Sequence, residues 1–186
     1  MKTEKVAFAA MQDGTQEDYD LLDRFYAANA LHQADRVLGW LRAMDGESPY
    51  RISRLHHCLQ TATRAENDDA DDETIVCALL HDIGDLLAPA NHSQLAAAML
   101  APFVSEKNHW IIGHHGLFQG YYYFHFVGQD RNARETYRDH PHYQACVDFC
   151  ARWDQPSFDP DFKTRPLSHF EPLVRELFAR EPGTFY

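Results

Sequence analysis

The sequence predicts an all-α fold, and three observations lead to that prediction. Apolar residues recur at helical spacing through most of the chain, and no sustained alternation of apolar and polar residues indicates a strand. Short polar breaks that contain glycine, proline or aspartate separate the apolar stretches. With 186 residues, the chain is long enough to bury one core of ordinary size. We therefore expect a single helical-bundle domain over residues 1–186.

The first half of the chain contains four predicted helices. Thr15 followed by Asp18 is typical of an N-terminal cap and begins a helix over about 15–31. Further helices are predicted over about 33–44, where Asp45 and Gly46 end the pattern, and over about 52–66. The acidic linker 67–72 favours the N-terminus of the next helix. That helix, over about 72–82, is apolar on nearly every side and should lie at the centre of the bundle.

The second half contains shorter predicted helices with more frequent breaks. Gly84 and Pro89 interrupt the chain before helices predicted over about 92–100 and 105–114. The stretch 116–123 is rich in glycine and aromatic residues and favours no particular assignment. Later helices are predicted over about 143–153 and 170–180, with an irregular, proline-rich segment between them.

Composition excludes several kinds of partner. The formal net charge of −11 argues against nucleic-acid binding, which requires a basic surface. No stretch approaches the roughly 18 apolar residues that a membrane-spanning helix needs. The four cysteines form no CxxC pair and are predicted to be buried free thiols of a cytoplasmic protein. The sequence implies no protein partner.

The residues most indicative of chemistry are His81 and Asp82, at the end of the apolar central helix. Two ionisable side chains at a buried position need compensation, and a divalent metal ion compensates both. Other potential ligands lie on separate predicted helices: His57, His92, His114 and Asp154. This order could supply two metals, with the Asp82 carboxylate as the bridge. His115 is the alternative to its neighbour His114.

Three motifs extend this interpretation to a resemblance. They are His57-Cys58-Leu59-Gln60, Ala78-Leu79-Leu80-His81-Asp82-Ile83-Gly84 and Arg152-Trp153-Asp154. They resemble the mixed-valent di-iron oxygenases of the HD-domain superfamily: the PhnZ- and TmpB-type phosphonate-cleaving oxygenases and, more distantly, myo-inositol oxygenase. The resemblance implies an HD-domain helical bundle whose metal-binding core spans about 50–154. Helices in 15–45 and the segment 155–186 would pack on that core.

The same resemblance implies the cofactors and their ligands. Two iron ions, as an Fe(II)/Fe(III) pair, would act with O2 as co-substrate. One iron would be held by His57, His81, Asp82 and Asp154, and the other by Asp82, His92 and His114. No catalytic residue is expected beyond these metal ligands.

The implied substrate is a small organophosphonate. Tyr50 stands where the pattern of the simple aminophosphonate enzymes has a carboxylate, and Asp85 stands where histidine is frequent. Phe118 and Gln119 replace a basic residue. These departures favour a trimethylammonium substrate, (1-hydroxy-2-(trimethylammonio)ethyl)phosphonate, cleaved to glycine betaine and phosphate. The predicted substrate-binding residues are Tyr50, Asp85, His115, Gln119, Tyr121 and Tyr122, with Arg131 and Arg134 as donors to the phosphonate.

Two alternatives stay open at this point. One is an HD-type metal-dependent phosphohydrolase, in which the metals activate water. The other is a signalling or scaffold HD domain without metal ligands, which the full set of candidate ligands disfavours.

Overall fold

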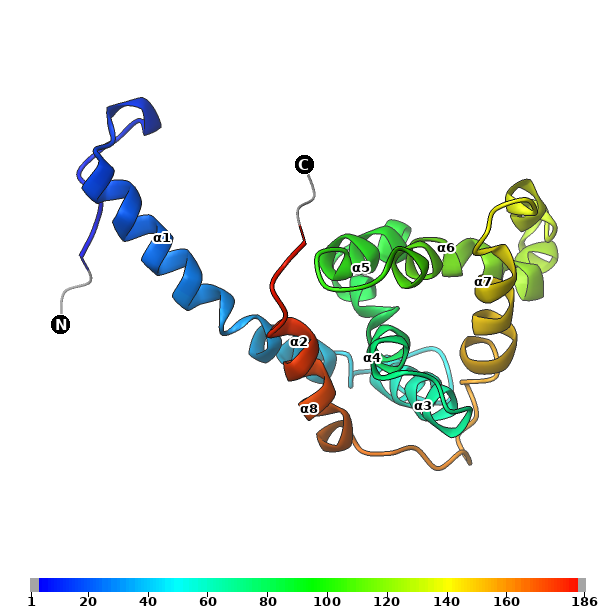
Figure 1. Cartoon of the computed structure of the whole chain (residues 1–186). Coiled ribbons are helices and arrows are strands. Elements are labelled where there is room, and N and C mark those ends of the chain that lie inside the picture. Colours follow the sequence, from blue (N-terminus) through cyan, green and yellow to red (C-terminus); the bar gives the residue numbers. More distant parts are fainter. Residues whose placement is uncertain (1–3, 184–186) are drawn as a thin grey trace.

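The computed structural model describes residues 4–183, and their regular structure is entirely helical (Figure 1). This confirms the predicted all-α class. The α-helices are α1 (Gln16–Ala30), α2 (Gln33–Ala43), α3 (Arg54–Asn67), α4 (Asp72–Leu80), α5 (His92–Leu100), α6 (Glu106–Tyr123), α7 (Tyr143–Phe149) and α8 (Leu167–Phe178). The shorter turn η1 (Met11–Asp13) precedes α1, and others connect later helices: η2 (Ile83–Leu86), η3 (Pro89–Asn91), η4 (Phe124–Val127), η5 (Ala133–Tyr137) and the π-turn η6 (Cys150–Asp154).

Helix α4 lies at the centre of the bundle, as its apolar sequence predicts. Every residue from Thr74 to Leu80 is buried. Helices α3, α6 and α8 contact α4 directly, and α5 packs along α6. The core is built from leucine, isoleucine, valine, alanine, phenylalanine and four buried free cysteines. The end of α4 therefore emerges where α3, α5 and α6 converge.

Local capping explains where several helices begin. Thr15 and Asp18 form a reciprocal capping box at the start of α1. Asp71, in the acidic linker, accepts a hydrogen bond from the backbone N–H of Thr74 at 2.7 Å and so caps α4. Ser53 and Ser105 cap α3 and α6 in the same way. These caps set the register of the helices that carry the candidate ligands.

The glycine-rich stretch 116–123 belongs to α6, which continues unbroken to Tyr123. Gly116 is needed there because α5 lies against it: a Cβ atom at this position would lie 2.6 Å from the Ser93 hydroxyl oxygen. Glycine therefore serves close helix packing at this position rather than a turn.

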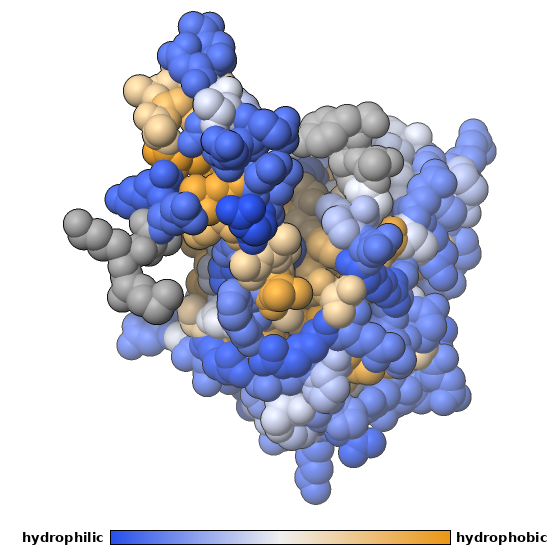
Figure 2. Space-filling view, turned by 60° about the vertical axis from the view of Figure 1, so that its left-hand side comes forward, coloured by the Kyte–Doolittle hydropathy of each residue, from blue (hydrophilic) through white to orange (hydrophobic). Residues whose placement is uncertain are grey.

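Helix α1 differs from the expectation that residues 15–45 pack on the core. Helix α2 buries Ala34, Val37, Leu38 and Leu41, but α1 contains no buried residue and projects away from the bundle (Figure 1). Part of its apolar surface is covered locally, since Phe8 of the preceding segment stacks on Tyr19 at 5.8 Å. The space-filling view shows mostly hydrophilic side chains with smaller hydrophobic patches between them (Figure 2). Within residues 4–183, no helix is long and apolar enough to cross a membrane.

Replacing Gly84 by alanine should destabilise the fold. A Cβ atom there would lie 2.3 Å from the backbone oxygen of His92, at the start of α5, and backbone cannot move aside cheaply. We expect a loss of about 1–3 kcal/mol in the free energy of unfolding, measured by urea denaturation. Gly39→Ala is the matched control, because a Cβ atom at this exposed position in α2 would have no neighbouring atom within 4 Å. That change should stabilise the protein by about 0.5–1 kcal/mol, and equal stabilities for the two variants would contradict the prediction.

Candidate metal centre

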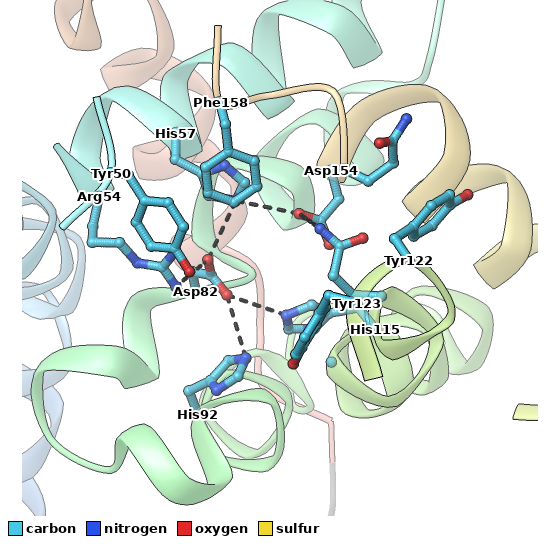
Figure 3. Close-up of a pocket in the computed structure, with 13 residues that line it drawn as sticks. Tyr50, Arg54, His57, Asp82, His92, His115, Tyr122, Tyr123, Asp154 and Phe158 are labelled. Atoms are coloured by element: carbon cyan, nitrogen blue, oxygen red, sulfur yellow. Dashed lines mark hydrogen bonds and ion pairs between the residues drawn. The ribbon is translucent and has the colours of Figure 1, made fainter. Parts of the chain in front are cut away.

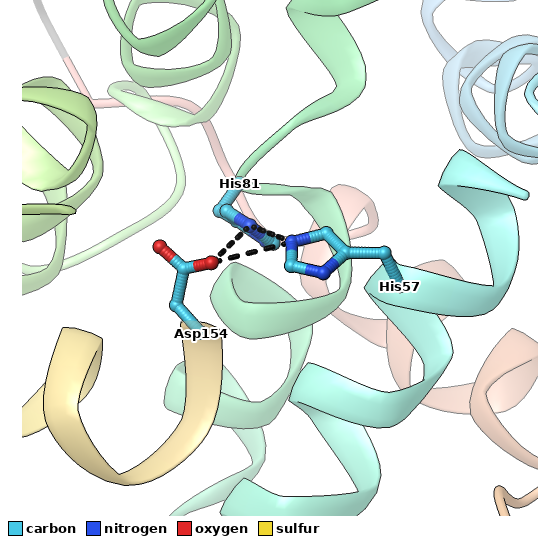
Figure 4. Close-up of side chains that lie close together, drawn as sticks. All are labelled: His57, His81 and Asp154. Atoms are coloured by element: carbon cyan, nitrogen blue, oxygen red, sulfur yellow. Dashed lines mark hydrogen bonds and ion pairs between the residues drawn. The ribbon is translucent and has the colours of Figure 1, made fainter. Parts of the chain in front are cut away.

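Six imidazole and carboxylate side chains converge beside the end of α4; Figure 3 shows five of them, and Figure 4 shows the sixth, His81. His57 comes from α3, and His81 and Asp82 directly follow α4. His92 is the first residue of α5, His115 lies on α6, and Asp154 ends the π-turn η6. All are buried except His92, whose side chain is 24% exposed.

Asp82 occupies the middle of this group, and its two oxygens face opposite ways. Oδ2 lies 3.3 Å from Nε2 of His57 and 3.4 Å from Nε2 of His81. Oδ1 lies 3.2 Å from Nε2 of His115 and 3.4 Å from Nε2 of His92. The carboxylate is thus shared between two clusters of donor atoms, which is the arrangement of a bridging ligand.

The first cluster is completed by Asp154 (Figure 4). Its Oδ1 lies 3.3 Å from Nε2 of His57 and 3.6 Å from Nε2 of His81, and the two imidazole nitrogens are 3.1 Å apart. These three residues offer ligand atoms that all lie within 4.8 Å of one another. Asp154 Oδ2 is buried and has no hydrogen-bond partner among the described residues. A bound cation would satisfy this buried carboxylate oxygen.

The backbone fixes which nitrogen of each imidazole faces the centre. Nδ1 of His57 lies 2.8 Å from the Ser157 carbonyl oxygen and Nδ1 of His81 lies 2.8 Å from that of Ala78. Nδ1 of His115 and of His92 likewise face the carbonyl oxygens of Ile112 and Pro89, at 2.7 and 3.3 Å. A carbonyl only accepts, so each Nδ1 must donate, and Nε2 is left to bind a metal through its lone pair when the ring is neutral. This is how proteins orient histidine toward a metal.

The electrostatics of the cluster favour a positive charge at its centre. Burial disfavours a charged His81, but the attraction of Asp82 and hydrogen bonding to Asp154 outweigh burial and raise its pKa to about 10. Burial alone would raise the pKa of Asp82, yet the charge of His81 and hydrogen bonds from neighbouring imidazoles hold it well below its usual range. A site that attracts protons so strongly also attracts metal cations, and its nitrogen and oxygen donors suit first-row divalent metals.

The structure differs from the sequence prediction at one ligand, because His115 rather than His114 reaches Asp82. Adjacent residues of a helix point about 100° apart, so only one of the pair can face the centre. His115 shares the buried face of Ile112 and Phe118, whereas His114 stacks on Trp110 at 4.2 Å. Sequence spacing alone does not distinguish the two histidines, because His114 has the same helical spacing to Ile111 and Phe118.

A cavity of about 340 Å³ opens beside the cluster and is lined by residues from both halves of the chain. Of the predicted substrate-binding residues, Tyr50, His115, Gln119 and Tyr122 line it. Gln119 also donates to Oδ1 of Asp154 at 3.1 Å.

Four predicted substrate-binding residues are not brought to the cavity. Asp85 does not line it, and its carboxylate is paired with Arg54. Tyr121 does not line the cavity either, and its ring contacts the two arginines predicted as phosphonate donors. The guanidinium groups of Arg131 and Arg134 lie 4.4 and 3.8 Å from the centre of its ring. Both arginines therefore pack against Tyr121, outside the lining of the cavity.

The cavity is also lined by Tyr123 and by three residues that were not predicted from the sequence: Arg54, Gln155 and Phe158. Arg54 could have been found from its position one helical turn before His57. Phe158 had no such signal, because it lies in the irregular segment after η6. It stacks on the His57 ring at 4.3 Å, with the adjacent Ser157 carbonyl accepting from the same imidazole. Gln60 holds this segment through hydrogen bonds with the backbone of Asp159.

The described residues form an all-helical bundle in which histidine and aspartate side chains that could hold metal ions converge. This combination is typical of helical metal-binding domains. A comparison with protein-family models identifies the HD domain over residues 54–152. This match covers more than half of the chain, and the protein belongs to the HD-domain family. A comparison with curated proteins finds no match.

Replacing His115 by alanine should lower the metal content. The second donor cluster, formed by His92 and His115 beside Oδ1 of Asp82, would lose one of its two nitrogen donors. We expect a fall from about two metal ions per chain toward about one, measured by elemental analysis after dialysis. His114→Ala is the control, since it removes the neighbouring imidazole and leaves every donor near Asp82 in place. A loss of metal in His114→Ala, with full metal content in His115→Ala, would reverse the assignment.

Proposed function

We propose that this HD-domain protein is an O2-dependent di-iron oxygenase that cleaves the carbon–phosphorus bond of a 1-hydroxyphosphonate. The observation that carries the proposal is the position of Asp82, with one oxygen toward each donor cluster at the base of an open cavity. Six nitrogen and oxygen ligands for two metals, beside space for a small molecule, suit a redox-active pair better than a closed structural zinc site. Two iron ions bound there would supply redox chemistry with O2 and Lewis-acid coordination of substrate oxygens.

The residues of the chain would contribute position and electrostatics. The carbonyl-bound Nδ1 atoms keep the four imidazoles oriented, so little reorganisation is needed when substrate binds. Gln119 fixes Asp154 by its hydrogen bond to Oδ1. Tyr122 and Phe158 cover the sides of the cavity and reduce the access of water to the reacting bond.

The substrate that we favour is (1-hydroxy-2-(trimethylammonio)ethyl)phosphonate, with glycine betaine and phosphate as products. The reaction balances with one O2 for each substrate: one oxygen atom enters the carboxylate and the other enters phosphate. Aromatic side chains support a trimethylammonium group at the outer part of the cavity. Tyr50 and Tyr123 are partly exposed at its rim, and Phe158 packs against Tyr50 at 4.8 Å. Their ring faces could attract a cation that has no N–H donors.

A metal-dependent phosphohydrolase is the second candidate. Its supporting observation is Arg54, a guanidinium in the cavity wall that could pair with a phosphate ester. The same two-metal centre could activate water instead of O2.

The reaction type can be tested with the iron-loaded protein and the favoured phosphonate. We expect O2 consumption and release of phosphate in equal amounts, recorded with an oxygen electrode and a phosphate assay. The control is Asp82→Ala, which should lose both metals and both signals because each cluster loses its shared carboxylate. Phosphate release at an undiminished rate under strict anaerobiosis would favour the hydrolase.

The aromatic rim can be tested by replacing Tyr123 with leucine. We expect binding of the trimethylammonium substrate to weaken roughly fivefold, for the loss of about 1 kcal/mol of cation–π attraction. The primary-amine analogue should lose less, because its N–H groups can still donate to other acceptors. Phe126→Leu is the control, since this side chain is 79% exposed and does not line the cavity. Equal losses for the two substrates would argue against an aromatic cation site.

A further inference from the structure

Arg54 places a positive charge directly beside the candidate metal centre (Figure 3). Its Nη2 donates to Oδ2 of Asp82 at 2.8 Å, and the same nitrogen contacts the carboxylate of Asp85. Both contacts use Nη2, so neither requires the donors on Nε and Nη1. The guanidinium can therefore hold its place and still present N–H groups to a further acceptor.

The surroundings keep this arginine charged and in position. Its side chain is only 24% exposed. Burial opposes the charge, but the two aspartates outweigh it and raise the pKa of Arg54 further. The first turn of α3 carries Arg54 and the next turn carries His57, so the helix fixes the guanidinium relative to the donor cluster.

Arg54 is the only lysine or arginine among the described residues that line the cavity. The other candidates, Arg131 and Arg134, lie against Tyr121 and outside the lining. Along the described wall of this cavity, an anion that reaches the metals would meet Arg54 next to Asp82 and no other permanently charged cation on the way.

We propose that Arg54 is a substrate-binding residue that recognises a phosphoryl or phosphonyl oxygen at the metal centre, with Asp85 as the positioning residue that holds its guanidinium. A planar guanidinium suits such oxygens because two parallel N–H groups can bind two of them. This role replaces the one predicted for Asp85, whose Oδ1 also lies 3.4 Å from Nδ1 of His92. The inference rests on the metal centre of the proposed function but not on its use of O2.

The test measures the affinity of inorganic phosphate for the metal-loaded protein by isothermal titration calorimetry, with the metal content determined on the same samples. Arg54→Gln should weaken phosphate binding at least about tenfold, because a charge-assisted hydrogen bond is lost. Arg54→Lys should lose less, since it keeps the charge without the planar fork. Arg51→Gln is the matched control: this exposed arginine precedes α3, does not line the cavity, and should leave the affinity unchanged.

Three results would overturn the proposal. One is an unchanged phosphate affinity in an Arg54→Gln protein that retains its metals. Another is a loss of metal in both Arg54 variants, which would show that the arginine supports Asp82 instead of binding substrate. The third is a metal-loaded native protein that does not bind phosphate. If the native protein binds metals and phosphate but consumes no O2 with the phosphonate, the oxygenase proposal fails while the role of Arg54 stands.

Discussion

The buried carboxylate of Asp82 is the constraint on which the rest of the structure depends. It is only 4% exposed, and a charge at that depth is tolerated only when opposite charge or hydrogen-bond donors surround it. Four imidazoles and one guanidinium do so, and they come from α3, the end of α4, α5 and α6. The glycines at 84 and 116 allow the approach of α5 that this convergence requires. The bundle therefore serves as a frame that brings distant residues around one side chain.

The helical backbone also orients the ligands that it carries. His81 and His115 each place Nδ1 against the carbonyl oxygen of the residue one turn earlier, Ala78 and Ile112. Such contacts are local and form together with the helix. His57 is different, because its carbonyl partner belongs to Ser157, far along the chain. The orientation of one imidazole in the first cluster therefore depends on tertiary structure, whereas the imidazoles of the second cluster are oriented by carbonyl oxygens three residues earlier.

Sequence patterns predicted the parts of this protein that local rules determine. The central helix, its acidic N-terminus and the position of His81 and Asp82 at its end all follow from apolar periodicity and capping. Among the candidate ligands, His115 rather than His114 lies beside Asp82, and the helical spacing of α6 did not separate these neighbours. The cavity wall was less accessible to prediction. Phe158 lies in a non-helical segment and reaches the cavity wall by stacking on His57. Asp85 pairs with Arg54 and does not line the cavity. Both positions depend on contacts between residues that are distant in the sequence.

The segment 157–159, which Gln60 holds through the backbone of Asp159, links the orientation of a candidate metal ligand to the shape of the cavity. Ser157 sets the orientation of the His57 imidazole, and the next residue, Phe158, shapes the cavity wall. An insertion or deletion here would disturb the cavity wall and the candidate metal centre together. Tyr122 and Tyr123, at the end of α6, also line the cavity, and neither side chain belongs to the donor clusters. Substitutions at Tyr122 and Tyr123 could therefore reshape the cavity while the candidate metal ligands, including His115 on the same helix, stay in place.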